Sequence, residues 1–447
     1  MCYTMIMNQI KERHYNMDNS VKREKIAEGV HFNSVTDPRY KFNKITVAFF
    51  TPLCEDKASL YALLPRCLHK ANALFPQSRD FNNYLASLYN AKSDFDIGVF
   101  GDTQLLGISM NSMDDSYALH GEKITDAAAK TIFDCVFRPA LESGVFVSAE
   151  VENGKRQQIE SIEAEINEKR HYAANQAKRI IFKGEPAAVN AHGSVEKTRE
   201  ITPGALYEAY KELLKSAVIE IVCVGCNGFD DALRIAKDQF SALERADIVA
   251  SESAYSPLKP EVAVKTELLP ALNQSKMVLG FKTGTHIIRP VLALMSNLYG
   301  GTISSKLFLN VREKLSLCYY CWSGINKQKG VMLVSCGVEE ANIEKAKAEI
   351  LSQLDSVRNG DFTDDELNWA LLAEQNNIKT VNDSLSSLTW WYIERIYMQE
   401  IESPEEYLKN YENIARENIT EAAKSMKLDT FYVLSGEASG SESEGTQ

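Results

Sequence analysis

The chain has 447 residues, of which 45% are hydrophobic and 25% charged, and its formal net charge is −12. This length favours more than one domain with its own core, and the acidic balance argues against a nucleic-acid-binding surface. No stretch approaches eighteen apolar residues, so the sequence predicts no membrane span. Nine scattered cysteines and the lack of a signal peptide predict a cytoplasmic protein with reduced thiols.

The first half of the chain alternates strand patterns with helical ones. Short apolar runs predict strands at 44–52, 94–100, 104–110 and 217–226. Helical periodicity fills the segment between the first two strands. It returns over a long polar stretch between the last two. This order is typical of an α+β domain.

The second half repeats that order at an offset of about 230 residues, far longer than the period of a solenoid. The matching strands are predicted at 275–284, 317–325 and 330–338, and the matching helices at 290–301, 306–315 and 341–360. The last helix is expected to begin beside Asn342 and to end with Gly360 in the C-cap position. The repetition suggests that a whole α+β domain was duplicated.

Weak periodicity and three prolines mark the boundary between the halves. The C-terminus is acidic and low in apolar residues, which is typical of a disordered tail. The predicted organisation is an N-terminal domain at 1–243, a linker at 244–270, a C-terminal domain at 271–435 and an acidic tail at 436–447.

The segment 298–324, LYGGTISSKLFLNVREKLSLCYYCWSG, resembles the C-terminal signature of the M16 peptidases, the pitrilysin- and insulinase-like zinc metallopeptidases. In that signature a glycine pair precedes Ser-Ser-Arg-Leu-Phe, an Arg-Glu-Lys segment and Leu-x-Tyr, and here Lys306 replaces the first arginine. Residues 182–226 are similar to the end of the family's N-terminal domain. The likeness covers roughly 28–435. It is greatest to bacterial M16-like proteins that are associated with aminopentanol modification of elongation factor P and encoded beside an active homologue.

The resemblance implies two similar M16-type domains, each an antiparallel sheet flanked by helices, that form a clamshell around a peptide. It also implies that Arg312 and Tyr319 hydrogen-bond the substrate backbone and the oxyanion, on the side that faces the zinc site. From their seven-residue spacing alone, a surface arginine and an ordinary strand tyrosine would be the better interpretation. The surrounding motif favours the functional one.

The family's zinc motif is absent from the sequence. Two histidines four residues apart on a helix, with a glutamate between them as general base, form the His-x-x-Glu-His site. The closest two of the seven histidines are 17 residues apart, and the motif positions fall on Leu63, Arg66 and Cys67. His69, beside this helix, is expected to be an ordinary structural histidine. We therefore predict no metal site and no cofactor in this chain.

Other candidate ligands are weaker. The resemblance also implies a third zinc ligand, a glutamate roughly 75 residues after the motif. Near that position stand three glutamates, which are predicted to lie on the solvated face of a charged helix: Glu150, Glu152 and Glu160. Two Cys-x-x-Cys pairs also fall on predicted strands: Cys223/Cys226 and Cys318/Cys321. Residues i and i+3 of a regular strand point to opposite faces, so these thiols are expected to be buried and reduced, with a redox role much less favoured.

The leading hypothesis is a non-catalytic subunit of a heterodimeric M16 zinc peptidase. It would bind a peptide or an unfolded protein segment and lend Arg312 and Tyr319 to a partner with an intact zinc motif, and zinc is expected in that partner. The alternative is a peptide-binding or scaffold protein with no role in hydrolysis. A self-sufficient metallopeptidase with unusual ligands is the least favoured reading.

Overall fold

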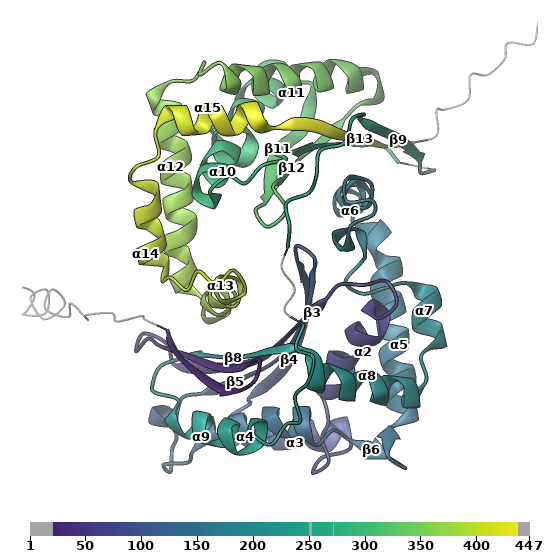
Figure 1. Cartoon of the computed structure of the whole chain (residues 1–447), viewed down its shortest axis with the longest axis vertical. Helices are drawn as coiled ribbons and strands as arrows, with labels where there is room; N and C mark the ends of the chain where they lie inside the picture. Colours follow the sequence, from purple (N-terminus) through teal and green to yellow (C-terminus); the bar gives the residue numbers. More distant parts are fainter. Residues whose placement is uncertain (1–20, 250–252, 271, 437–447) are drawn as a thin grey trace, which may run out of the picture.

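The computed structural model describes residues 21–249, 253–270 and 272–436. A six-stranded and a five-stranded sheet form two halves that face each other, with most helices on the outer sides (Figure 1). Residues 1–20 and, apart from Gly436, the predicted acidic tail lie outside the described residues. The predicted α+β fold, with two similar domains arranged as a clamshell, is confirmed.

The N-terminal sheet has the order β1-β2-β8-β3-β5-β4 and is antiparallel except for the β2–β8 pair. Its strands are β1 (Lys22–Ala27), β2 (Val30–Thr36), β3 (Phe42–Pro52), β4 (Lys92–Phe100), β5 (Thr103–Met113) and β8 (Val218–Gly225). The helices of this half are α2 (Ala58–Leu68), α3 (Ser78–Ser87), α4 (Ile124–Phe137), α5 (Ser148–Glu163), α6 (Lys169–Ile181), α7 (Val195–Glu200), α8 (Pro203–Ser216) and α9 (Asp230–Phe240), with a small hairpin of β6 (Leu141–Glu142) and β7 (Val145–Phe146).

The C-terminal sheet has the order β11-β12-β10-β13-β9 and is antiparallel except for the β13–β9 pair. Its strands are β9 (Ala263–Leu268), β10 (Ser275–Lys282), β11 (Cys318–Asn326), β12 (Val331–Val338) and β13 (Lys427–Ser435). The helices are α10 (Arg289–Ser296), the π-helical turns η4 (Asn297–Gly301) and η5 (Leu307–Lys314), α11 (Ile343–Arg358), α12 (Asp364–Lys379), α13 (Leu385–Tyr397), α14 (Pro404–Leu408) and α15 (Arg416–Ser425). Short 3₁₀ turns lie at η1 (Asp115–Tyr117), η2 (Ala164–Asn167), η3 (Pro186–Ala188), η6 (Glu340–Asn342), η7 (Thr380–Asp383) and η8 (Lys409–Tyr411).

The two sheets share one topology. Strands β2-β8-β3-β5-β4 correspond in order and direction to β9-β13-β10-β12-β11, so the internal repetition of the sequence is visible in the fold. Three strands of the repeat were not predicted: β2, β9 and β13. Of these, β9 lies within the segment assigned to the linker and pairs in parallel with β13. The predicted domain boundaries themselves stay predictions.

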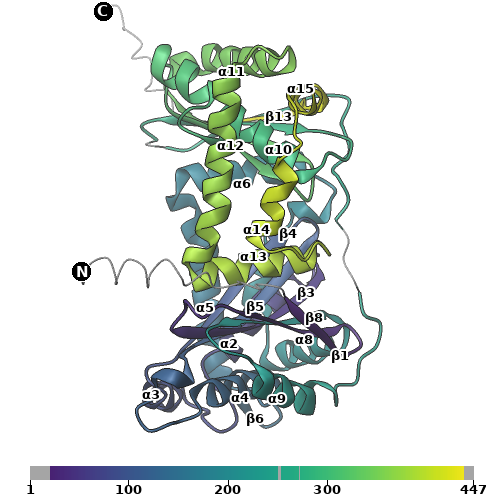
Figure 2. The same ribbon diagram turned by 90° about the vertical axis from the view of Figure 1, so that its left-hand side faces the viewer.

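Each half covers the inner sheet face of the other with one helix (Figure 1). Helix α6 packs Ala173 and Ala177 against Val278 and Tyr432 of the C-terminal sheet. In the reverse direction, α13 packs four side chains on the inner face of the N-terminal sheet: Leu388, Tyr392, Ile393 and Ile396. Figure 2 shows α12 and α14 running from the C-terminal half toward the N-terminal sheet, where α13 lies across it. This exchange buries both inner faces and ties the halves together.

A buried charge network also joins the halves. The ammonium of Lys329 lies 2.7 Å from Asp102 and 2.9 Å from Glu185, and only 2% of its side chain is exposed. Lys282, fully buried, lies 3.4 Å from Asp429 and 3.6 Å from Glu185. Asp102 and Glu185 belong to the N-terminal half, and the two lysines and Asp429 to the C-terminal half. Since each buried lysine has two carboxylates within 4 Å, the cost of burying its charge is offset.

The sequence signals for helix ends are confirmed in α11. Asn342 is the N-cap residue, and Gly360 follows the helix with φ of +77°. That left-handed conformation carries little penalty in glycine, because it has no Cβ atom. The residues at its two ends therefore fix where this helix begins and ends. It covers the outer face of the C-terminal sheet.

Candidate functional site

The M16-like motif follows α10 and forms two π-helical turns, η4 and η5, and most of the edge strand β11. Gly300 lies so close to β11 that an added Cβ would come 2.9 Å from the backbone nitrogen of Ser323 and 2.6 Å from Leu307. The glycine pair thus permits a tight backbone approach at the end of a helix. π-Helical turns are uncommon and often occur at functional sites.

Arg312 lies on η5 with part of its side chain in solvent. Its guanidinium lies 4.6 Å from the ring centre of Phe308 and 3.6 Å from the carboxylate of Glu313. Both neighbours are on the same turn, and the side chain of Arg312 is 41% exposed. These contacts hold the planar group at the surface and leave donors free for another molecule.

Tyr319 stands at a β-bulge in the edge strand β11. Cys318 pairs with Val338 and Tyr320 pairs with Gly337, so Tyr319 is the extra residue between two consecutive pairs. A bulge re-aims side chains and bends the strand. Tyr319 is 66% exposed, and among the described residues no hydrogen-bond partner of its hydroxyl is found. A phenol this exposed contributes little to the core.

The segment around both residues also exposes apolar surface. Five large hydrophobic side chains between residues 303 and 322 are more than a third exposed: Ile303 (76%), Leu309 (38%), Leu315 (39%), Tyr319 (66%) and Trp322 (37%). Exposed apolar groups are ordinary when they are isolated, but a concentration of them in one segment is typical of an interaction surface.

The positions that would carry the zinc ligands lie on α2 and are closed. Leu63 is fully buried, and Arg66 and Cys67 are 7% exposed. Helix α5 packs alongside, with Gly154 opposite the first and third positions: an added Cβ would come 2.9 Å from Leu63 Cδ1 and 3.4 Å from Cys67 Sγ. These four residues offer one thiol and no carboxylate or imidazole. They do not fit a catalytic zinc ion, which needs three such ligands and an open position.

The charged groups near this region have other partners. The Arg66 guanidinium lies 5.0 Å from the ring centre of Phe95 and donates a 3.3 Å hydrogen bond to Ser161. Burial raises the pKa of Cys67 to about 12, so its thiol stays protonated. His69 Nδ1 donates to the carbonyl of Pro65 at 2.9 Å, and burial lowers the pKa of His69. His69 is therefore placed as the structural histidine that we expected.

The three glutamates near the expected third ligand form ion pairs, and that of Glu150 with Lys70 is partly buried. Glu150 lies 2.7 Å from Lys70, Glu152 lies 2.9 Å from Lys155, and Glu160 lies 4.0 Å from Arg156. Glu152 and Glu160 are more than 60% exposed. The residue that faces Leu63 and Cys67 is Gly154, which sequence reasoning missed because helix packing partners are not visible in a single sequence.

The prediction that Cys318 and Cys321 point to opposite faces of the sheet is wrong. The bulge at Tyr319 returns both side chains to the helix-covered face of the sheet, where Cys321 pairs directly with Cys336 of β12. The three sulfur atoms lie within 4.8 Å of one another. Hydrogen bonds from the other two thiols, and then Arg312, lower the pKa of Cys318, while hydrogen bonding to Cys318 raises those of its two neighbours.

The other Cys-x-x-Cys pair forms no such cluster among the described residues. Cys223 is fully buried in β8, and Cys226 lies just beyond the end of that strand and is partly exposed. Burial raises the pKa of both thiols. Both are free cysteines, and neither takes part in a group of metal-ligating side chains within the part of the chain that the structure describes.

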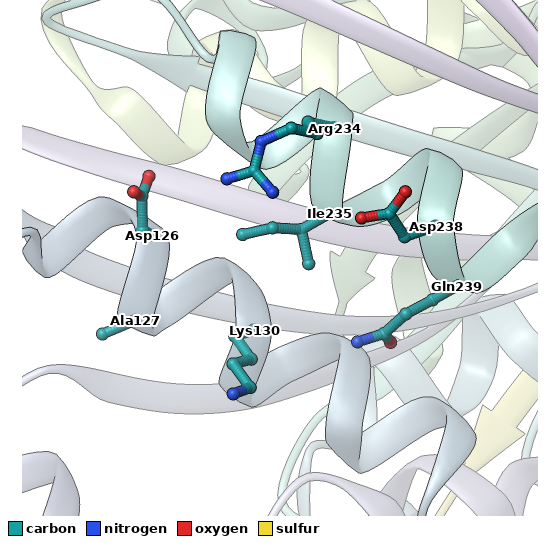
Figure 3. Close-up of a pocket in the computed structure, with 7 residues that line it drawn as sticks. All are labelled: Asp126, Ala127, Lys130, Arg234, Ile235, Asp238 and Gln239. Carbon is teal, nitrogen blue, oxygen red and sulfur yellow. The ribbon is translucent and has the colours of Figure 1, made fainter.

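Two cavities lie away from these residues. A cavity of about 850 Å³ between the halves is lined by polar groups that include Arg23, Glu220 and Arg289, and by Tyr397. Figure 3 shows a smaller groove of about 420 Å³ between α4 and α9, where charged side chains of both signs alternate: Asp126, Lys130, Arg234 and Asp238. Neither cavity is lined by Arg312 or Tyr319. No described helix is long and apolar enough to cross a membrane.

Comparison with known proteins supports the predicted relationship. Residues 200–372 match the family model for the peptidase M16 inactive domain. The chain is 28% identical over 403 residues to the probable inactive metalloprotease YmfF of Bacillus subtilis (strain 168), an alignment that covers 89% of this chain and 94% of that protein. The predicted resemblance to the M16 family, and to its inactive proteins in particular, is thus confirmed.

Solved structures share the fold. A conserved protein from Enterococcus faecalis V583 aligns with a TM-score of 0.86 and 24% identity over 94% of this chain and all of that chain. A protease from Helicobacter pylori aligns with a TM-score of 0.75 and 14% identity, covering 93% and 100% of the two chains. A peptidase M16 inactive domain from Pseudomonas fluorescens aligns with a TM-score of 0.73 and 17% identity, covering 94% and 98%.

Proposed function

We propose that this chain, a homologue of inactive M16 metalloproteases, is the non-catalytic subunit of a heterodimeric zinc peptidase. It binds a peptide and lends Arg312 and Tyr319 to the active site of a partner that carries an intact His-x-x-Glu-His motif. One observation carries the proposal. Arg312 and Tyr319 reach solvent, while the zinc positions of the same chain are packed shut by Leu63 and Gly154.

The chemistry of the two exposed groups suits this role. A phenol hydroxyl donates a hydrogen bond to the negative charge that develops on a peptide carbonyl oxygen during hydrolysis, and one such donor is worth about 2.7–4 kcal/mol. A guanidinium donates in a planar fork to the peptide backbone or to the same oxygen. Zinc in the partner would supply the activated water. Neither side chain can act as a general base, so the chain alone is expected to be inactive.

The exposed apolar segment supports a protein partner. Ile303 and Tyr319, both about two-thirds exposed or more, flank Arg312 in sequence. Interfaces are enriched in aromatic residues and arginine at their centre. A partner that covers this segment would remove apolar surface from water and bring its own active site to the two polar groups. A cytoplasmic location, where reduced cysteines are stable, is part of the proposal.

The test is reconstitution with an M16 homologue that has an intact zinc motif. The two proteins are mixed, their mass is measured by light scattering, and cleavage of a fluorogenic peptide library is followed. We expect a heterodimer and a turnover that neither protein has alone. A double variant, Arg312→Ala with Tyr319→Phe, should pair normally and lose that gain.

A matched control is Tyr117→Phe, which removes the hydroxyl of a tyrosine that is 44% exposed in the N-terminal half. This control should keep full turnover. Separate species in the scattering experiment would refute the heterodimer. A heterodimer whose activity is insensitive to the double variant would support the alternative instead, in which the chain is a peptide-holding scaffold with no part in hydrolysis.

A further inference from the structure

We propose that Cys318, Cys321 and Cys336 form a binding site for one thiophilic d¹⁰ metal ion, such as Zn²⁺ or Cu⁺. The three sulfur atoms lie within 4.8 Å of one another. They are the only three or more histidine, cysteine or acidic side chains that converge in this way among residues 21–249, 253–270 and 272–436. The site adjoins Arg312 and Tyr319, but metal binding there does not depend on the proposed peptidase function, and it lies away from the motif positions on α2.

The chain uses an irregular strand to build this cluster. In a regular strand Cys318 and Cys321 would point to opposite faces of the sheet. The extra residue at Tyr319 brings both onto the face that carries Cys336, the direct cross-strand partner of Cys321. A bulge disrupts the hydrogen-bond ladder locally, and a packed core does not require one. The convergence of the three thiols therefore has a structural cost that core packing alone does not explain.

The surroundings suit a thiolate-bound cation. All three side chains belong to the apolar core beneath the outer helices, with exposures of 9%, 3% and 0%. Thiolate sulfur is the ligand that zinc and monovalent copper prefer, and a dry apolar shell strengthens the bond. Arg312 acts electrostatically on Cys318, and Lys276 acts on Cys336. Two cationic groups therefore offset part of the negative charge that remains when three thiolates bind one ion.

The less specific explanation is three apolar thiols in a core. Cys67, Cys135 and Cys223 fit that description, because each is buried and belongs to no such group of three among the described residues. The β11–β12 cluster differs because each sulfur has two others beside it. Binding would replace the thiol protons with the metal and release them to solvent. Cys318, the most exposed of the three, marks the route by which an ion would enter.

The experiment titrates the full-length, reduced protein with Zn²⁺ and, separately under anaerobic conditions, with Cu⁺ in competition with a chromophoric chelator. Cd²⁺ serves as a spectroscopic probe of thiolate ligation. We expect one ion per chain and a thiolate-to-metal absorption band. Cys318→Ser and Cys336→Ser should each weaken binding by more than about 100-fold. Changing a residue that only supports a ligand from outside the first coordination sphere costs up to about 100-fold, and these two residues are proposed as ligands themselves.

Two controls keep the proposal falsifiable. Cys223→Ser changes a fully buried thiol of the other half and should leave binding unchanged. Circular dichroism of metal-free protein shows whether each variant folds, and Cys318→Ser, nearest the surface, is expected to do so. The proposal is overturned if the reduced wild type binds no ion, if binding survives the double variant Cys318→Ser/Cys336→Ser, or if two of the thiols form a disulfide that persists in excess reductant.

Discussion

The α2–α5 region of the N-terminal half and the η5–β11 region of the C-terminal half lie beside the two matching sheets and expose opposite chemistry, although they are not counterparts in the repeat: α10 follows β10 as α2 follows β3. Ten residues of α2 are buried, including the three that stand at the positions of the His-x-x-Glu-His motif. On η5 only Leu307 and Val311 are buried. The molecule therefore carries a closed apolar packing region in one half and an accessible polar and aromatic segment in the other. A shared fold does not require a shared site.

The largest expected effect is in the accessible η5–β11 region. In the reconstituted heterodimer, Tyr319→Phe should lower turnover by about 10²–10³-fold, since it removes one oxyanion donor. Arg312→Lys should also fail to restore the activity lost in Arg312→Ala, because an ammonium cannot reproduce the planar fork. Steady-state kinetics on the purified pair measure both effects.

The thermal stability of these variants is the companion measurement. Both side chains are substantially exposed, so their melting temperatures should stay near that of the wild type, in line with changes within about 0.5 kcal/mol for surface positions. If Tyr319→Phe keeps full turnover while the pair forms, the exposed phenol has no part in hydrolysis, and the difference between the two regions is one of packing alone.

In the packed α2–α5 region, substitutions should lower the free energy of unfolding. Leu63→Ala removes a fully buried side chain that packs against Gly154, and it should lower the free energy of unfolding by about 3 kcal/mol. Leu309→Ala, on η5 and 38% exposed, should cost within about 0.5 kcal/mol. Urea denaturation followed by circular dichroism measures both. Equal losses at the two positions would contradict the contrast between a packed and an open region.

How far a single sequence reveals this contrast depends on whether the signal is local. The apolar strands around β10 and β12 and the caps of α11 follow from local patterns, and the loss of zinc ligands follows from residue identity at Leu63 and Cys67. Three features depend on distant partners and were not predicted: Gly154 opposite α2, the exchanged helices α6 and α13, and the bulge that gathers the cysteines. A period-two rule assumes regular pairing, and one extra residue in β11 reverses its result.

A smaller effect concerns the partner surface. Ile303→Asp places a charge on an apolar side chain that is 76% exposed, and it should weaken heterodimer formation by about tenfold or more, equivalent to about 1.4 kcal/mol. The matched control is Leu119→Asp, at a residue 78% exposed in the N-terminal half, which should pair like the wild type. Analytical ultracentrifugation gives both affinities. If the control weakens pairing as much as Ile303→Asp, the interface lies elsewhere.

The smallest effect is a pH dependence in the closed region, and it involves His192. Gln158 donates a 3.0 Å hydrogen bond to the backbone carbonyl of His192. Burial, and then the charge of Arg66, lower the pKa of His192 to about 4, below the value of about 6.5 for an unperturbed histidine. Between these two pH values the unfolded chain binds a proton that the folded chain does not. Burial of the neutral imidazole therefore does not reduce stability above about pH 6.5. The free energy of unfolding then falls progressively as the pH drops from about 6.5 toward 4.

His192→Gln should flatten this part of the stability curve by on the order of 1 kcal/mol. His171→Gln, at an exposed histidine on α6, should leave the slope as it is in the wild type. Urea denaturation at a series of pH values between 4 and 7 makes the comparison. An unchanged slope in His192→Gln would mean that solvent reaches the imidazole. In that case the packing of this region would be looser around His192 than the burial of Leu63 and Arg66 indicates.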